Sequence, residues 1–202
     1  STVTSQSSSS CSFFAPDAKI EPHVGGAYEV YMDPLANPGM KGADDMRVMA
    51  VQPKRMISFD WNAPPHLAEA RKQRTFVVVR LEPVGERQTR VTLHHTGWGD
   101  GGEWDATYDY FDKAWGAVLG NLKKRFDSGP QDWGPWMDQL RKMHEADAGR
   151  TSRQGPQPSS CWRSACSSWS AWPRARRPSE RSATARADAN ALGVLGPIWV
   201  PS

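Results

Sequence analysis

One stretch of the chain, residues 102–126, carries the only long helical repeat of large apolar residues in the sequence. Its apolar side chains recur at steps of three and four residues: Tyr108, Phe111, Trp115, Val118, Leu122 and Phe126. This spacing places them on one stripe of an α-helix, and such a stripe is normally buried against another layer of the protein. We therefore expect a helix over residues 102–126 that is packed along one side.

Signals for both ends of this helix flank the apolar stripe. Asp100 and Glu103 have the spacing of a capping box, and residues 128–130, Ser-Gly-Pro, follow three cations that suit the end of a helix. Gly116 and Gly120 lie one turn apart within the helix. Because glycine has no side chain, we expect another backbone or a ligand to approach closely at these two positions.

The chain before this helix contains five segments in which apolar and polar residues alternate, as is typical of β-strands. The segments are residues 27–32, 45–50, 55–61, 74–81 and 89–96. Most of the connections between them are short, which favours an antiparallel meander. The predicted fold class is therefore α+β, with one antiparallel sheet closed on one face by the long helix.

The two ends of the chain differ in composition from its middle. Residues 1–12 contain seven Ser, and residues 148–202 are rich in Ser, Arg, Ala and Pro without a sustained period. We expect an unstructured head and a tail that is disordered or translated out of frame. The segment 150–202 carries a net charge of +6 while the whole chain carries +3, so residues 1–149 carry −3. The core domain is therefore not expected to bind nucleic acid.

The cysteine content and the hydropathy pattern indicate a cellular compartment. All three cysteines lie in the head or the tail, at positions 11, 161 and 166, so the predicted domain has no disulfide framework. No apolar run reaches the roughly 18 to 20 residues of a membrane span. We expect a soluble, cytoplasmic protein without a membrane span.

The sequence lacks the short motifs GxSxG, HExxH, paired CxxC and the P-loop. The best polar candidate is His95, which is expected to point inward, where it binds a ligand oxygen, acts as a general base or is simply hydrogen-bonded within the core. His94 points to the opposite face and cannot converge with His95 on one metal ion. Asp105, Asp109 and Asp112 are interpreted as a solvated face of the helix. Neither a metal nor another cofactor is therefore expected.

Six segments resemble, in order, those of the START-like SRPBCC superfamily. They are FAP at 14–16, VGGAY at 24–28, DMRVMAVQPKRMISFDW at 45–61, TFVVVRLEP at 75–83, TRVTLHHTGW at 89–98 and YFDKAWGAVLGNLKKRF at 110–126. Within the superfamily, the chain is most similar to the group named after the activator of heat-shock-protein-90 ATPase. The resemblance covers about residues 13–133. It implies a helix-grip fold, in which a curved antiparallel sheet wraps a long C-terminal helix and encloses an apolar cavity.

The chain departs from this family pattern before Phe14. A complete member begins with a strand and short helices, whereas this chain has twelve Ser-rich residues in that place. We therefore expect residues 13–147 to form an incomplete START-like domain. The loss of a strand would leave an unpaired sheet edge.

The resemblance implies a domain without catalytic activity that binds a small apolar or amphipathic ligand in its cavity. The candidate lining residues are Tyr28, Phe59, Trp61, Val77, Val79, Leu93, His95, Tyr108 and Trp115. For each of these side chains taken alone, packing in a core is the default interpretation. Two alternatives remain: a co-chaperone-like activator of heat-shock-protein-90 ATPase that acts through its surface, and a cyclase or hydrolase that uses His95 with Tyr108 or Asp105.

Overall fold

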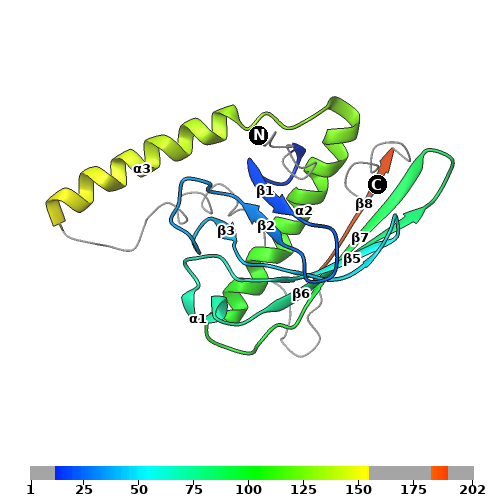
Figure 1. Cartoon of the computed structure of the whole chain (residues 1–202), viewed down its shortest axis with the longest axis horizontal. Coiled ribbons are helices and arrows are strands. Elements are labelled where there is room, and N and C mark those ends of the chain that lie inside the picture. Colours follow the sequence, from blue (N-terminus) through cyan, green and yellow to red (C-terminus); the bar gives the residue numbers. More distant parts are fainter. Residues whose placement is uncertain (1–11, 155–182, 191–202) are drawn as a thin grey trace, which may run out of the picture.

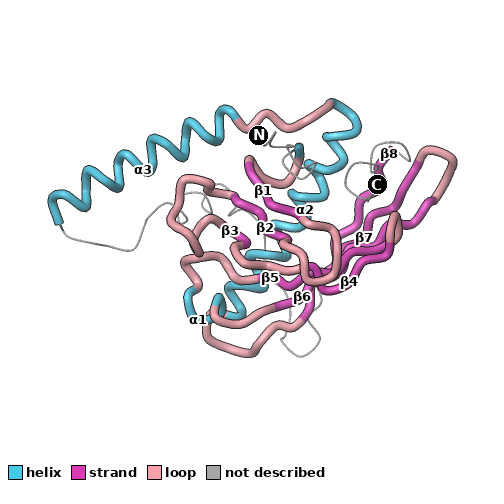
Figure 2. Tube along the Cα trace, viewed as in Figure 1, coloured by secondary structure: helices cyan, strands magenta, loops and turns pink. Residues whose placement is uncertain are grey.

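The computed structural model describes residues 12–154 and 183–190 of the 202-residue chain (Figure 1). Its strands and helices are β1 (Asp17–Ile20), β2 (Tyr28–Tyr31), β3 (Gly42–Ala43), β4 (Val48–Gln52), β5 (Met56–Trp61), α1 (Ala68–Arg71), β6 (Thr75–Pro83), β7 (Gln88–Thr96), α2 (Trp104–Ser128), α3 (Gly134–Gln154) and β8 (Ala183–Asn190). Figure 2 shows the strands gathered into a curved layer, with α2 lying along it. The predicted α+β helix-grip arrangement is therefore confirmed.

The strands form two antiparallel sheets that continue into one another. One sheet has the order β1-β2-β3, and the other has the order β4-β5-β6-β7-β8. A bridge between Ala27 and Arg47 joins the two sheets, and the Tyr28 amide donates to the Met46 carbonyl at 2.8 Å beside it. The junction makes a single curved surface that one helix can cover.

The alternating strands bury the faces that their sequence predicts. In β5, Ile57, Phe59 and Trp61 are buried, and the residues between them are only partly covered. In β7, Leu93 and His95 are buried in the same way. The apolar faces of these strands meet the buried face of α2 in one core.

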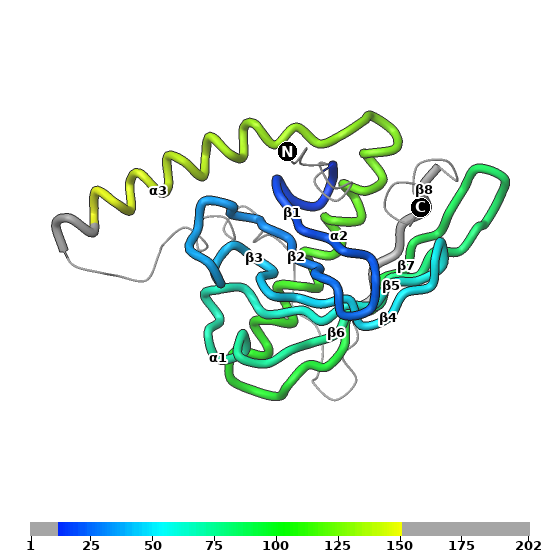
Figure 3. Tube along the Cα trace, viewed as in Figure 1, coloured from blue at the N-terminus to red at the C-terminus, as the bar shows by residue number. Residues whose placement is uncertain are grey.

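Helix α2 begins at Trp104, but the expected capping box does not form. Glu103 occupies the N-cap position with helical backbone angles, and no side chain caps the helix. The Glu103 carboxylate instead accepts hydrogen bonds from the amides of Glu69 at 2.8 Å and Ala70 at 3.0 Å. These amides lie at the start of α1, whose position beside the start of α2 is visible in Figure 3. The carboxylate therefore satisfies the unpaired amides of α1 in place of those of α2.

The apolar stripe of α2 faces the sheet. Its buried residues are Trp104, Thr107, Phe111, Trp115, Leu119 and Leu122. Val118 is only half-buried, and Leu119, outside the predicted stripe, is buried in its place. The helix ends before Gly129, whose φ of 96° suits glycine.

Gly116 and Gly120 do not serve the close approach that their spacing suggests. Both residues are exposed. Among the described residues, no heavy atom lies within 4 Å of a Cβ built at either position. The two glycines lie on the side of α2 away from the core. No part of the core packs into the space that their missing side chains leave.

Replacing either glycine with alanine is therefore expected to stabilise the protein. Glycine in a helix costs about 0.5 to 1 kcal/mol relative to alanine, and the added methyl group meets no steric obstacle here. Urea unfolding of Gly116→Ala and Gly120→Ala should show an increase of this size in the free energy of unfolding. A decrease for either variant would show that its position is closely packed.

Helix α3 was not expected from the sequence. It docks on the loop after β2, where Trp136 Nε1 donates to the Met32 carbonyl at 2.9 Å and His144 Nε2 lies 2.8 Å from Asp33 Oδ2. Leu140 lies between these two contacts and is buried. The contact residues of α3 are Trp136, Leu140 and His144, which recur every four positions. This spacing is the signal that could have predicted the helix. Across residues 12–154 and 183–190, no helix has the length and apolar character of a membrane span.

A short part of the tail also takes part in the fold. Strand β8 pairs antiparallel with β7 along its full length, from Gln88 opposite Asn190 to His95 opposite Ala183. We expected a disordered tail, and the pairing of residues 183–190 with β7 differs from that expectation. The pairing is possible because an unpaired edge of β7 can bond the backbone of any extended segment. Residues 1–11, 155–182 and 191–202, which include all three cysteines, lie outside the described residues, so the expected domain limits remain predictions.

Candidate functional site

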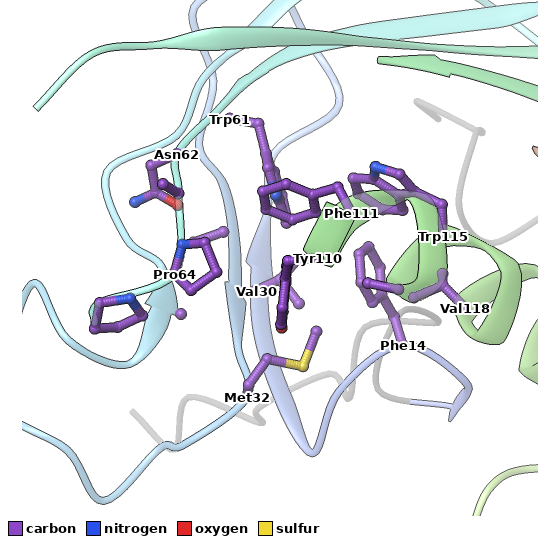
Figure 4. A pocket seen from close by; sticks show the side chains of 15 residues that line it. Phe14, Val30, Met32, Trp61, Asn62, Pro64, Tyr110, Phe111, Trp115 and Val118 are labelled. Carbon is purple, nitrogen blue, oxygen red and sulfur yellow. The ribbon is translucent and has the colours of Figure 1, made fainter. Parts of the chain in front are cut away.

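A partly open cavity of about 50 Å³ lies between α2, the β2–β3 region and the loop after β5 (Figure 4). It is lined by Phe14, Val30, Met32, Gly42, Ala43, Trp61, Asn62, Ala63, Pro64, Pro65, Tyr110, Phe111, Ala114, Trp115 and Val118. Figure 4 shows Asn62 and Pro64 on one side of the cavity, opposite Tyr110 and Phe111. We call this cavity the α2 pocket. Its lining is mostly apolar, and its polar side-chain groups are the Asn62 amide, the Tyr110 hydroxyl and the indole N–H groups of Trp61 and Trp115.

Local sequence explains two walls of the α2 pocket. Strand β5 ends at Trp61, and Pro64 and Pro65 prevent the segment that follows from continuing as a paired strand. On the other wall, Gly42 has a φ of 146°, and a Cβ at this position would lie 2.6 Å from the Val30 carbonyl oxygen. Only glycine therefore lets β3 pair with β2 at the edge of the pocket.

Aromatic rings that pack on one another form the inner wall. Phe14 stacks on Trp61 with ring centroids 6.0 Å apart, and its edge meets Trp115 at 5.9 Å. Phe111 also stacks on Trp115, with ring centroids 5.7 Å apart. Mutual packing of this kind fixes the orientation of the rings, so the wall is preorganised.

Arg71 holds the wall that contains Asn62. Its guanidinium donates to the carbonyls of Ala63, of Gly39 at 2.7 Å and of Gly42 at 2.8 Å, and its Nη2 lies 3.3 Å from Asp44 Oδ2. Partial burial lowers the pKa of Arg71 below its ordinary value, and the nearby Asp44 carboxylate opposes this shift. One side chain thus joins the loop after β2 to the segment after β5.

His95 lies in the core and does not line the α2 pocket. Its Nδ1 accepts a hydrogen bond from Trp115 Nε1 at 2.9 Å, because an indole nitrogen can only donate. Its Nε2 therefore carries the proton and donates to Thr75 Oγ1 at 2.7 Å, and that hydroxyl donates to the Trp61 carbonyl at 3.2 Å. The ring has an exposed fraction of 0%, and burial lowers the pKa of His95 to about 3. Both nitrogens of a neutral imidazole are engaged, so the ring has no free nitrogen for general-base chemistry.

The structure brings two of the nine candidate lining residues into the α2 pocket, Trp61 and Trp115. Tyr28 stacks on Phe59 with ring centroids 3.7 Å apart, which fills the space that was expected to be open. The remaining candidates pack into or against the core: Val77, Val79, Leu93, His95 and Tyr108. The four strand residues lie on the expected face of the sheet and Tyr108 lies on α2, but neighbouring side chains pack against all five.

Several lining residues were missed because they come from irregular segments. Phe14 precedes β1, and Asn62 and Pro64 follow β5. Tyr110 and Ala114 lie on α2 beside the predicted stripe, one turn apart. Their spacing of four residues, continued by Val118, was the available signal for a second lining row on the helix.

Comparison with known proteins gives one match. The family model described as "Activator of Hsp90 ATPase homolog 1-like protein" matches residues 3–127. No curated protein and no solved structure matches the chain. The match begins about ten residues before the expected limit and ends within α2, so α3 and β8 lie outside it. Because the match covers more than half of the sequence and the fold agrees with it, this chain belongs to the Activator of Hsp90 ATPase homolog 1-like family, a START-like SRPBCC family.

Proposed function

We propose that the domain binds a small, mainly apolar molecule in the α2 pocket without transforming it. The observation that carries this proposal is the lining, in which packed aromatic and aliphatic side chains surround a partly open cavity. Ligand sites in proteins typically combine an apolar lining with a few placed polar groups. The Asn62 amide and the Tyr110 hydroxyl are such groups here.

The size of the α2 pocket limits the ligand. Pockets for drug-sized molecules measure roughly 300 to 1,000 Å³, and this cavity is about 50 Å³. A small body of a few heavy atoms fits inside it, and a larger ligand extends through the open side. The ligand class is therefore small molecules, or larger molecules of which one apolar end is buried.

The chemistry of the lining favours binding over turnover. General acid–base catalysis needs an ionisable group within hydrogen-bond reach of the reacting atom. Among the described residues, the lining contains no carboxylate, imidazole, amine or thiol, and its one ionisable side chain is the Tyr110 phenol. The nearby imidazole of His95 is hydrogen-bonded to Trp115 and Thr75. The pocket can hold a molecule but offers no acid–base pair.

Filling the α2 pocket should weaken binding of an apolar fluorescent probe by about tenfold or more, a loss of about 1.4 kcal/mol. Ala114→Leu places three extra carbon atoms in the cavity, because Ala114 lines it from α2. Ala106→Leu is the matched control, since Ala106 is exposed on the same helix and does not line the pocket. Fluorescence titration of both variants and the original chain gives the comparison, and the stability of Ala114→Leu should be unchanged or higher.

Two outcomes would contradict the proposal. Equal probe affinity in Ala114→Leu and the original chain would mean that the probe binds elsewhere. Absence of saturable probe binding, together with stimulation of ATP turnover by heat-shock protein 90, would favour action through the protein surface.

A further inference from the structure

The α2 pocket contains one buried side-chain amide in a mostly apolar wall. Asn62 has an exposed fraction of 5%, and its side chain lines the pocket beside Pro64 (Figure 4). Each polar atom of a side chain this deeply buried normally has at least one hydrogen-bond partner. The partners of its two amide atoms therefore indicate whether a ligand completes the site.

The oxygen of this amide is bound to Arg71. A guanidinium can only donate hydrogen bonds, so the amide atom that faces it is Oδ1, which accepts from Nη1 at 3.1 Å and from Nη2 at 3.2 Å. The nitrogen then takes the position drawn as oxygen in Figure 4, on the side of the amide away from Arg71. Within the described part of the chain, no acceptor is bonded to this nitrogen. The Nδ2 group is thus a buried donor that lacks its acceptor, and burial of such a donor costs free energy.

The charge beside this amide selects the chemistry of the acceptor. The positive guanidinium of Arg71 lies directly behind Asn62, so it polarises the amide and repels a cationic ligand. An anion would lose its hydration among the apolar side chains, while Asp44 already partly neutralises Arg71. A neutral oxygen acceptor gains the hydrogen bond without either penalty.

We propose that the ligands of the α2 pocket are small neutral molecules with a hydrogen-bond-accepting oxygen on an apolar body, such as cyclic ketones, esters or lactones. The oxygen accepts from Asn62 Nδ2, and the apolar body lies against Pro64 beside the amide and against Tyr110 and Phe111 across the pocket. This assignment rests on the proposed function and narrows it to a ligand class.

Two probes of nearly equal shape test the assignment by NMR titration. Cyclopentanone carries an acceptor oxygen, and methylenecyclopentane replaces that oxygen with a methylene group. Both are followed through the backbone amides of Trp61, Ala63 and Val118, which border the pocket. In the original chain, cyclopentanone should bind about 5- to 50-fold more tightly than methylenecyclopentane, because only the ketone satisfies the buried donor. Its addition should also shift the side-chain amide protons of Asn62, a result that needs no variant.

Asn62→Asp removes the donor and keeps an oxygen for Arg71. The preference for the ketone should then disappear, while the affinity for methylenecyclopentane stays within about twofold, since the apolar wall is unchanged. Asn121→Asp makes the same chemical change on α2 outside the pocket and should preserve the preference.

The outcomes separate this inference from the proposed function. If neither probe perturbs the pocket amides, the proposed function is wrong. If both probes bind with equal affinity in the original chain and the Asn62 amide protons do not shift, the α2 pocket is still the ligand site but the proposed role of Asn62 is wrong. Tighter binding of cyclopentylammonium than of cyclopentanone would also overturn the assignment.

Discussion

Replacing Trp115 with alanine is expected to lower the free energy of unfolding by about 3 to 5 kcal/mol, as for other large aromatic truncations in cores. Trp115 has an exposed fraction of 2% and packs against Phe14, Trp61 and Phe111. Its indole also donates to His95, whose Nδ1 would lose its partner. The variant thus combines a cavity with an unsatisfied buried nitrogen, and both changes destabilise the folded state.

Urea unfolding of Trp115→Ala measures this loss. Lys113→Ala is the control, because Lys113 is exposed on the same helix and its loss should change stability by no more than about 0.5 kcal/mol. A loss below about 1 kcal/mol for Trp115→Ala would mean that α2 does not bury this face against the sheet.

Acidification from pH 7.5 to pH 5 should destabilise the protein by about 2 kcal/mol through His95 alone. The folded state holds the pKa of His95 at about 3, below the ordinary value of 6.5, because burial disfavours the charged ring. Between these two values the unfolded chain binds a proton that the folded chain does not. The stability that the neutral ring confers is therefore fully present above pH 6.5 and is lost as the pH falls toward 3.

His95→Gln tests this pH dependence. Glutamine can still accept from Trp115 and donate to Thr75, but it does not titrate. The difference in unfolding free energy between pH 7.5 and pH 5 should be about 2 kcal/mol smaller in His95→Gln than in the original chain. His94→Gln, the adjacent residue on the opposite face of β7, should keep the original pH dependence. Equal pH dependence in His95→Gln and the original chain would show that the buried chain of hydrogen bonds does not exist.

The fold could be predicted largely from periodicity. The alternation in β5 and β7 specified a buried face, and the three-and-four spacing of α2 specified the stripe that covers it. Elements with weaker signals were missed. Helix α3 has a mostly polar surface with one narrow row through Trp136, Leu140 and His144, and β8 takes its place by pairing with the exposed backbone of β7. Backbone pairing of this kind leaves little trace in side-chain patterns.

The candidate site was harder to predict because a strand pattern gives the face of a side chain but not its neighbours. Val77, Leu93 and His95 point inward as expected. The space beside them is filled by the Tyr28–Phe59 stack and by Trp115 and therefore holds no ligand site. The open part of the interior lies at the turn after β5, where Asn62 and Pro64 have no periodicity to reveal their direction. Only the packed structure shows which part of the buried face remains empty.

Intermolecular nuclear Overhauser effects between cyclopentanone and the protein test the location of the ligand most directly. Binding in the α2 pocket predicts contacts from the ring protons of the ketone to the Ala114 methyl group, the Pro64 ring and the aromatic ring of Phe111, all of which line the cavity. The same contacts should weaken in Ala114→Leu and persist in Ala106→Leu. Contacts confined to residues outside this lining, such as Val79 or Val84, would contradict a ligand site between α2 and the segment after β5.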